Sequence, residues 1–439
     1  MDFISLSKSV PVVGHYDVAV CGGGPSGFIS AISAARAGKK TALIERFGFL
    51  GGTATGDYVV PISGFFFKEK PVVGGIAWEF VKRLEKIGAA QVEYPKGNVS
   101  VNIEYYKLVA EEMLLESGVT LYTNAYLSGC MTEEVAEGTR ITHAVFESKN
   151  GTEAITADCF IDATGDGDLA AFAGVPMLPA PEALQPVSLC FVLTNVDTDT
   201  DLLRDYVHHN GKYGKNSCVK EIRSHLLSLI ESGDAPQFGG PWFNVLLKGK
   251  SVAVNITRAE VDATDRAAFT KAEFELRKNM FALVELLRAH YPEFRNAEIV
   301  ASGINAGIRE TRHIKGIRTM SLRDVLDGTV FGCPVAHCAH PMDIHAAKGA
   351  GQELTSLTGD CYVPFEATVA DRFPNLIVAC RALSAEREPY ASLRVQATLM
   401  SVGECAGVAA ALACDTATPT FALPQDILKR NIDTRAVVL

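Results

Sequence analysis

The stretch "YDVAVCGGGPSGFISAISAARAGKKTALIER", residues 16–46, decides the fold, because three consecutive glycines separate a strand-like pattern from a helix-like one. Residues 17–20 form a short apolar run that is typical of a buried strand in a parallel sheet. Residues 26–37 are small and compatible with a helix, and Gly38 occupies a helix C-cap position. A second strand is expected over 41–44. The stretch therefore predicts a complete β-α-β unit.

The glycines of this turn have the G-x-G-x-x-G spacing, and Glu45 ends the second strand. Bare backbone lets a pyrophosphate come close, the helix N-terminus offers N–H donors, and a carboxylate accepts hydrogen bonds from ribose hydroxyls. A glycine triplet alone also makes ordinary tight turns, but here strand, helix and acid are in register. The turn therefore predicts a dinucleotide site, formed by Gly22, Gly24, Pro25, Ser26 and Gly27.

Further along, the loop "GGTATG" at 51–56 is either a flexible turn or a backbone surface for an extended cofactor. Two alternating runs, 141–147 and 152–155, are joined by an Asn-Gly turn and indicate a β-hairpin. The parallel sheet is expected to resume at 159–163 and to stop at 164–168.

Composition excludes several functions. The chain has 439 residues, 48% of them hydrophobic, and a net charge of −10 without a basic stripe, which argues against nucleic-acid binding. Its 11 cysteines include no Cys-x-x-Cys pair and indicate reduced thiols in the cytoplasm. The first residues lack the pattern of a signal peptide. Arg394, Gln396 and Glu404 interrupt the most apolar late segment, so no membrane span is expected.

Five motifs occur in order along nearly the whole chain. They are the 16–46 unit with "GFLGGTATG", "FIDATGDGDLAAFAG" at 160–174, "GIRETRHIKG" at 307–316, "PMDIH" at 341–345, and the run at 362–413 that contains "NLIVACRALSAEREPYASLRVQATLMSVGECAGVAAALA". This pattern resembles the FAD-dependent oxidoreductases of the glutathione-reductase-like two-dinucleotide-fold superfamily, related to fumarate reductase and succinate dehydrogenase flavoproteins.

The resemblance implies an α/β fold, with a Rossmann-type FAD-binding domain, a β-meander and an inserted antiparallel α+β substrate-cap domain. We expect the FAD-binding domain to comprise residues 14–180 and 296–420, and the cap to comprise 181–295. Within the cap, strand-like runs precede a segment with apolar residues at helical spacing.

The resemblance also assigns cofactor contacts. It places the glycines at the pyrophosphate, Glu45 at the adenosine ribose and Ala125 beside the adenine. The expected FAD-binding residues are Gly22, Gly24, Pro25, Ser26, Gly27, Glu45, Arg46, Gly52, Thr53, Ala125, Thr164, Gly165, Asp166, Arg381, Arg394 and Val395. The segment "RFGFLGG" lacks the histidine that holds flavin covalently in some relatives, so non-covalent FAD is expected. A second dinucleotide fingerprint is absent from the sequence.

Candidate catalytic residues gather in "CPVAHCAHPMDIHAAKG", residues 333–349. Its Cys and His spacing matches no standard zinc site, so no metal is expected. Asp343 and His345 form the leading pair, in which the carboxylate orients an imidazole that carries the proton, and His340 is the next candidate. The alternative is that these histidines are exposed and without a role.

Arg309 and Arg312 flank a short acidic stretch, and two arginines can hold a carboxylate or polarise a carbonyl. The alternative is that they form salt bridges with Glu310 or neighbouring acids.

These observations predict an enzyme that exchanges a hydride between flavin N5 and a small organic substrate, as a dehydrogenase or an ene-reductase. The alternative is a flavoprotein subunit of a larger electron-transfer complex. The electron donor or acceptor and homo-oligomerisation stay open.

Overall fold

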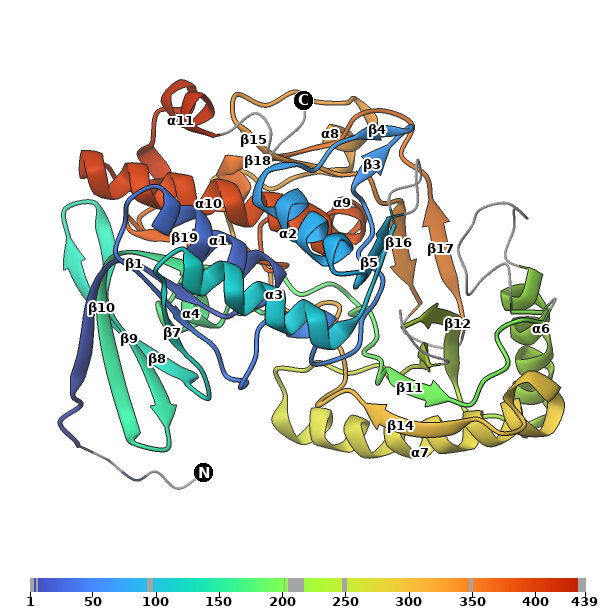
Figure 1. The fold of residues 1–439 in the computed structure, drawn as a ribbon. Coiled ribbons are helices and arrows are strands. Elements are labelled where there is room, and N and C mark those ends of the chain that lie inside the picture. The colour runs from blue at the N-terminus through green and yellow to red at the C-terminus, as the bar shows by residue number, and fades with distance from the viewer. Residues whose placement is uncertain are drawn as a thin grey trace.

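The structure is a computed structural model that describes residues 4, 7–92, 98–200, 202–203, 217–246, 251–346 and 350–432. Parts of the predicted cap and the last three residues of the 333–349 cluster lie outside the described residues. Figure 1 shows two units: a sheet covered by helices, and a smaller antiparallel sheet lined by one long helix. The predicted α/β fold with a Rossmann-type unit and an antiparallel α+β insertion is confirmed.

The larger sheet has seven described strands in the order β7-β2-β1-β10-β9-β8, with β19 beside β10. Its strands are β1 (Val12–Cys21), β2 (Thr41–Ile44), β7 (Thr120–Tyr122), β8 (Tyr126–Val135), β9 (Gly138–Ser148), β10 (Gly151–Asp162) and β19 (Leu376–Val378). β7, β2, β1, β10 and β19 are parallel, whereas β8, β9 and the first half of β10 form an antiparallel meander. The second strand of the predicted hairpin and the resumed strand are therefore one continuous strand, β10, and the first strand of the hairpin is β9.

Alternate residues of β1 enter different cores, as expected from the two-residue period of a strand. Val18 and Val20 face the cluster formed with the helices, whereas Ala19 and Cys21 face the meander. All four side chains are fully buried. The central strand is therefore covered on both faces, which explains its continuous apolar run.

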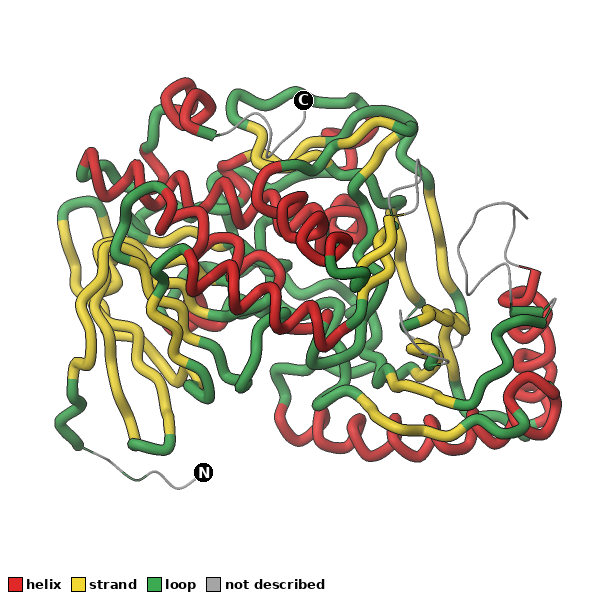
Figure 2. The backbone as a smooth tube through the Cα atoms, in the orientation of Figure 1, coloured by secondary structure: helices red, strands yellow, loops and turns green. Residues whose placement is uncertain are grey.

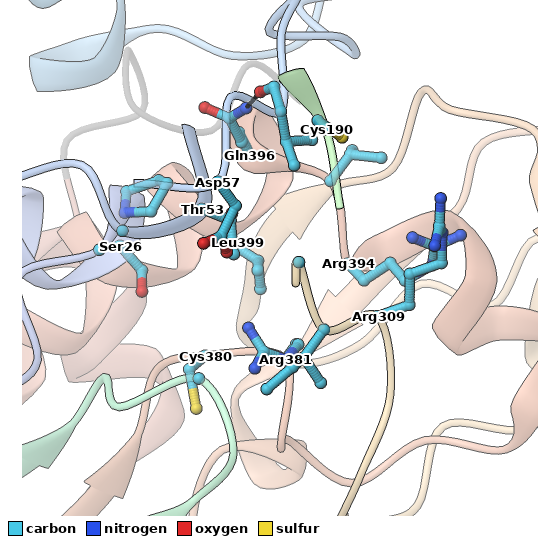
Figure 3. Close-up of a pocket in the computed structure, with 18 of the residues that line it drawn as sticks. Ser26, Thr53, Asp57, Cys190, Arg309, Cys380, Arg381, Arg394, Gln396 and Leu399 are labelled. Carbon is cyan, nitrogen blue, oxygen red and sulfur yellow. Dashed lines mark hydrogen bonds between the residues drawn. The ribbon is translucent and has the colours of Figure 1, made fainter. Parts of the chain in front are cut away.

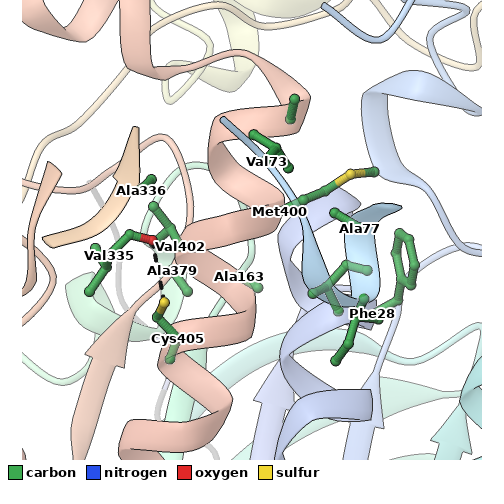
Figure 4. Packing of buried hydrophobic residues seen from close by; sticks show 14 of the residues in the cluster. Phe28, Val73, Ala77, Ala163, Val335, Ala336, Ala379, Met400, Val402 and Cys405 are labelled. Carbon is green, nitrogen blue, oxygen red and sulfur yellow. Dashed lines mark hydrogen bonds between the residues drawn. The ribbon is translucent and has the colours of Figure 1, made fainter. Parts of the chain in front are cut away.

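The helix after the glycine turn packs against the alanine-rich helix near the C-terminus. They are α1 (Pro25–Arg36) and α10 (Gln396–Thr416), and Figures 1 and 2 show them side by side over the sheet. A Cβ at Gly403 would lie 2.3 Å from the Ser26 carbonyl oxygen, so only glycine permits this approach. Phe28 and Met400 are fully buried near this contact (Figure 4), and each such side chain stabilises the fold by about 1.5–3 kcal/mol.

Further helices cover this side of the sheet. α2 (Gly75–Lys86) and α3 (Ile103–Glu116) lie beside α1. The Glu404 carboxylate of α10 accepts a hydrogen bond from the Ile76 N–H at 2.8 Å, in the first turn of α2. This bond satisfies a donor at the start of a helix that has no side-chain cap.

The smaller sheet has the strand order β12-β13-β11-β14 and is antiparallel. Its elements are β11 (Phe191–Thr194), β12 (Phe238–Val245), β13 (Val252–Thr257), β14 (Glu298–Ser302), α6 (Ser217–Ser232) and α7 (Arg266–His290). The buried face of α7, which includes Leu276, Leu283 and Leu287, packs into the core of this sheet. We call this unit the cap. β14 belongs to its sheet although it follows the predicted boundary at residue 295, and the predicted domain boundaries stay predictions.

The described chain also contains shorter elements. They are β3 (Phe66–Phe67), β4 (Lys70–Pro71), β5 (Ala90–Val92), β6 (Val99–Val101), α4 (Asp168–Phe172), α8 (Leu322–Leu326), β15 (Pro334–His337), β16 (Met342–His345), β17 (Gln352–Thr355), β18 (Tyr362–Pro364), α9 (Arg387–Leu393) and α11 (Gln425–Asn431). By length and composition α10 could cross a membrane, but 83% of its most apolar window is buried within the protein.

Candidate active site

A cavity of about 710 Å³ runs from the glycine turn to the cap. Its wall combines the β1-α1 turn, the ends of β2 and β10, the start of α10 and the inner face of the cap. Figure 3 shows Ser26 and Thr53 on one side of this space and Arg309 and Arg394 on the other, with Cys380 and Arg381 between. Segments far apart in the chain therefore meet around one cavity.

The glycines of the first turn have distinct structural roles. Gly22 has φ +101°, and a Cβ there would lie 2.4 Å from the Ala163 carbonyl oxygen. A Cβ at Gly27 would lie 1.9 Å from the Gly22 carbonyl oxygen, so Gly27 closes the turn without lining the cavity. A Cβ at Gly24 would meet no protein atom within 4 Å, and Gly24 lines the cavity. Its bare backbone is therefore open to a ligand.

Two helix N-termini face this cavity. Gly24 is the N-cap of α1 and Val395 is the N-cap of α10, and neither helix start has a side-chain cap. Both residues line the cavity. The first N–H groups of each helix, together with its positive dipole end, suit phosphate or other negatively charged oxygen atoms.

Glu45 lies at the end of β2 and is 5% exposed. Its carboxylate accepts hydrogen bonds from the Gly23 N–H at 2.6 Å and the Phe47 N–H at 2.8 Å. Burial raises its pKa. Each oxygen keeps further acceptor capacity toward the cavity, which suits ribose hydroxyls. An open glycine face, a helix N-terminus and this acid together fit an adenine dinucleotide.

An ion pair between Arg381 and Asp166 stabilises the middle of the cavity wall. Arg381 donates to Asp166 Oδ1 at 2.7 Å, and Thr311 Oγ1 donates to the same oxygen at 2.5 Å. Arg381 lines the cavity, whereas Asp166 lies behind it. Thr164 lines the cavity too, and its hydroxyl donates to Asp162 at 2.7 Å.

Asp57 lies on the wall between the glycine turn and the cap, and it is 3% exposed. The Asn305 side-chain amide donates to its Oδ1 at 3.0 Å. Burial raises the pKa of Asp57 to about 7, against the opposing attraction of Arg46 and Arg381. This carboxyl can therefore hold or release a proton near neutral pH.

At the cap end, Asp343 and His345 form a hydrogen-bonded chain with Arg258. Arg258 Nη2 lies 3.0 Å from His345 Nδ1, and His345 Nε2 lies 3.0 Å from Asp343 Oδ2. Because a guanidinium only donates, Nδ1 accepts and Nε2 carries the hydrogen toward Asp343. Burial and the nearby Arg309 lower the pKa of His345 to about 3, whereas His345 and Arg394 lower the pKa of Asp343 against its burial. His345 is thus a neutral imidazole with both nitrogens engaged.

His340 lines the same end of the cavity. Its Nδ1 lies 2.8 Å from the Pro341 carbonyl oxygen and must donate to it, which leaves Nε2 as an acceptor. Burial lowers its pKa, so the ring is neutral at pH 7. No described side chain hydrogen-bonds to Nε2.

The two arginines of the 307–316 motif have different surroundings. Arg309 lines the cavity and donates to the Pro186 carbonyl oxygen at 2.7 Å and to Ser188 Oγ at 2.8 Å. Arg312 lies outside the cavity wall and pairs with Asp168. Neither forms a described ion pair with Glu310, which accepts a hydrogen bond from the Gln185 N–H.

The structure places most predicted site residues on one wall, and places Gly27, Asp166 and Arg312 behind it. Sequence reasoning missed Asp57, although it directly follows the second glycine loop and a carboxyl there was a usable signal. It also missed lining residues that had not been singled out as candidates. They include Ser188, Cys190, Trp242, Asn244, Asn255, Asn305, Gln352, Gln396 and Leu399. Among the described residues there is no group of three or more His, Cys, Asp or Glu that could hold a metal ion.

Comparison with known proteins agrees with this geometry. The family model described as "FAD dependent oxidoreductase" matches residues 17–432. The dihydrolipoyl dehydrogenase of Trypanosoma brucei brucei is 49% identical over 54 residues, which cover 12% of this chain and 11% of that protein. The mitochondrial dihydrolipoyl dehydrogenase of Schizosaccharomyces pombe is 46% identical over 48 residues, covering 11% and 9%. The match thus spans about a tenth of these relatives.

Two solved structures align with this chain at low identity. The flavin-dependent brominase Bmp2 aligns with a TM-score of 0.51 and 12% identity, covering 95% of this chain and 83% of that chain. A geranylgeranyl bacteriochlorophyll reductase-like protein from Thermoplasma acidophilum aligns with a TM-score of 0.46 and 13% identity, covering 96% and 92%. At 12% identity, the similarity to Bmp2 shows a common fold.

Proposed function

Because the chain belongs to the FAD dependent oxidoreductase family and uses FAD, we propose that it exchanges a hydride between flavin N5 and a small organic substrate under the cap. The observation that supports this most strongly is the single cavity that joins the dinucleotide turn to a buried group of titratable side chains. We propose that Gly24 and the start of α1 hold the pyrophosphate and that Glu45 holds the adenosine ribose.

We propose His340 as the group that takes or returns the substrate proton. Its neutral ring presents a bare Nε2, because Nδ1 is committed to the Pro341 carbonyl. The sequence favoured His345, and that role stays a prediction. In the described geometry, however, His345 would have to give up Arg258 or Asp343 before it could accept a proton. Asp343 and His345 are better suited to hold the cavity wall beside His340 in place through their hydrogen bonds.

The cap supplies polar groups for the rest of a substrate. Trp242 and Asn244 come from β12 and Asn255 from β13, and all three line the cavity. Side-chain amides and an indole N–H can hydrogen-bond a polar substrate at this end. We therefore propose that the cap selects the substrate.

The test is a visible spectrum of the purified protein during anaerobic addition of alcohols, amines and activated alkenes, the last after chemical reduction of the flavin. Bleaching or reoxidation by one substrate class, without a partner protein, would support hydride exchange and fix its direction. If substrate is converted only after oxygen is admitted, with oxygen consumed in step, a monooxygenase activity would replace the proposal. Electron exchange with an added ferredoxin alone would favour the electron-transfer subunit. Cytoplasmic location and non-covalent FAD binding remain proposals.

A further inference from the structure

Arg309 is a cation on the cavity wall that has no acidic partner within ion-pair distance among the described residues. Within the part of the chain that the structure describes, its guanidinium donates to neutral oxygens alone, the Pro186 carbonyl and the Ser188 hydroxyl. Taking an ionised group out of water is costly unless an opposite charge compensates it. A ligand that enters the cavity can provide that charge.

Burial, and after it the nearby Arg394, lowers the pKa of Arg309 to about 10, and Figure 3 shows both side chains at the same end of the cavity. Arg394 Nη2 donates to the Asp343 carbonyl oxygen at 2.9 Å. The same Nη2 atom lies 3.6 Å from Asp343 Oδ2. Its Nε is buried and has no hydrogen-bond partner among the described groups. An unused buried donor therefore accompanies the uncompensated charge of Arg309.

Charge on this part of the wall is unbalanced. Arg309 and Arg394 are cations, Asp343 is the only acid beside them among the described lining residues, and His340 and His345 are neutral because their pKa values are lowered. Asp343 is already engaged by His345 and by the Gln352 amide at 2.7 Å. Arg258, which contacts His345, adds a further cation behind this wall, so positive charge is in excess here and an anion would compensate it.

We propose that Arg309 and Arg394 bind a carboxylate of the substrate at the cap end of the cavity. This inference rests on the proposed function and specifies its substrate class. Guanidinium groups donate in a fork that matches a carboxylate. A carboxylate also brings less negative charge toward the nearby Asp343 carboxylate than a doubly charged phosphate does. His340 and the cap amides line the same cavity as the two arginines, so a polar carboxylic acid fits the site.

The experiment titrates the purified flavoprotein with acetate, pyruvate, succinate and benzoate at constant ionic strength, and with the methyl esters of the same acids. Binding is read from the shift of the flavin spectrum and independently from the melting temperature. At least one acid should bind tenfold or more tightly than its ester. Methyl phosphate serves as the phosphate probe and should bind more weakly than that acid.

Arg309→Gln should weaken the best acid by about 30-fold and leave its ester unchanged, because it removes charge-assisted hydrogen bonds. Arg318→Gln is the matched control, since Arg318 pairs with Asp324 at 2.6 Å outside the cavity wall. Its acid affinity should not change.

Equal affinities for acids and esters, tighter phosphate binding, or no response to any acid would overturn the carboxylate site. An altered flavin spectrum in Arg309→Gln with unchanged acid affinity would overturn it too, because Arg309 would then face the flavin. The acid and ester comparison on the unmodified protein does not depend on whether the variant folds. A protein that purifies without flavin would contradict the proposed function instead, and the melting temperature would still report acid binding.

Discussion

The two ends of the cavity are built by different means. At the glycine-turn end, one continuous segment supplies the open backbone of Gly24, the helix start and the Glu45 carboxylate. At the cap end, Arg309, His340 and Arg394 come from separate segments and are oriented by neutral or buried neighbours. The first end depends on backbone shape and the second on charge, so they should respond to different substitutions.

The largest effect is expected from Gly27→Ala at the glycine-turn end. The new Cβ would lie 1.9 Å from the Gly22 carbonyl oxygen and force the turn open. We expect FAD affinity to fall by more than about 100-fold and the melting temperature of the protein without FAD to fall as well. Isothermal titration with FAD and thermal unfolding measure both effects.

Gly24→Ala is the matched variant, because its Cβ meets no protein atom within 4 Å and extends into the cavity. We expect weaker FAD binding with an unchanged melting temperature of the protein without FAD. Equal loss of stability in both variants would contradict the distinct roles assigned to these glycines.

The same contrast explains what sequence could predict. The β-α-β unit, the place of Glu45 at the end of β2 and the Asn-Gly hairpin depend on residues close together in the chain. The local sequence pattern was therefore enough to predict them. Arg309 and Arg312 looked equivalent because both flank one short motif. Only the tertiary structure places Asp168 beside Arg312 and leaves Arg309 on the cavity wall. Arg258 had no motif, yet it fixes the tautomer of His345.

The cap end is tested by His340→Gln, the second largest expected effect. Loss of the acceptor Nε2 should slow flavin reduction by about 100-fold while FAD stays bound. Because burial lowers the pKa of His340, the reaction of the unmodified protein should slow only below the ordinary histidine range, as the ring becomes protonated. Stopped-flow absorbance at several pH values measures both.

His345→Gln is the comparison for this prediction. The His345 ring lies between Arg258 and Asp343, so the variant should displace these side chains of the cavity wall. It should slow flavin reduction by less than His340→Gln does. A larger effect from His345→Gln would instead assign the proton to His345, as the sequence favoured.

Asp57 joins the two ends, because it follows the second glycine loop and accepts a hydrogen bond from Asn305. Its pKa is raised to about 7 in the folded protein and is near 3.9 in the unfolded chain. Its protonated form therefore favours folding below about pH 4, and that stability is lost as pH rises through 7. Asp57→Asn should raise the free energy of unfolding by about 4 kcal/mol at pH 8.

The control for Asp57→Asn is the same variant at pH 4, where the folded carboxyl is protonated and the unfolded one is about half protonated, so the difference should become small. Urea unfolding of the protein without FAD at the two pH values measures it. An equal gain at both pH values would mean that the buried charge is not its cause.

The smallest effect is expected from Glu45→Gln, which keeps the shape of the glycine-turn end but changes its charge. Both Glu45 oxygens accept backbone hydrogen bonds, from Gly23 and Phe47, so the amide NH₂ must face one of these donors. We expect FAD affinity to fall by about tenfold, the scale of one lost hydrogen bond to a charged group. Flavin fluorescence quenching measures the affinity, and Glu133→Gln in the exposed part of β8 is the control. If Glu45→Gln alters carboxylic acid binding more than FAD binding, the two ends of the cavity are not independent.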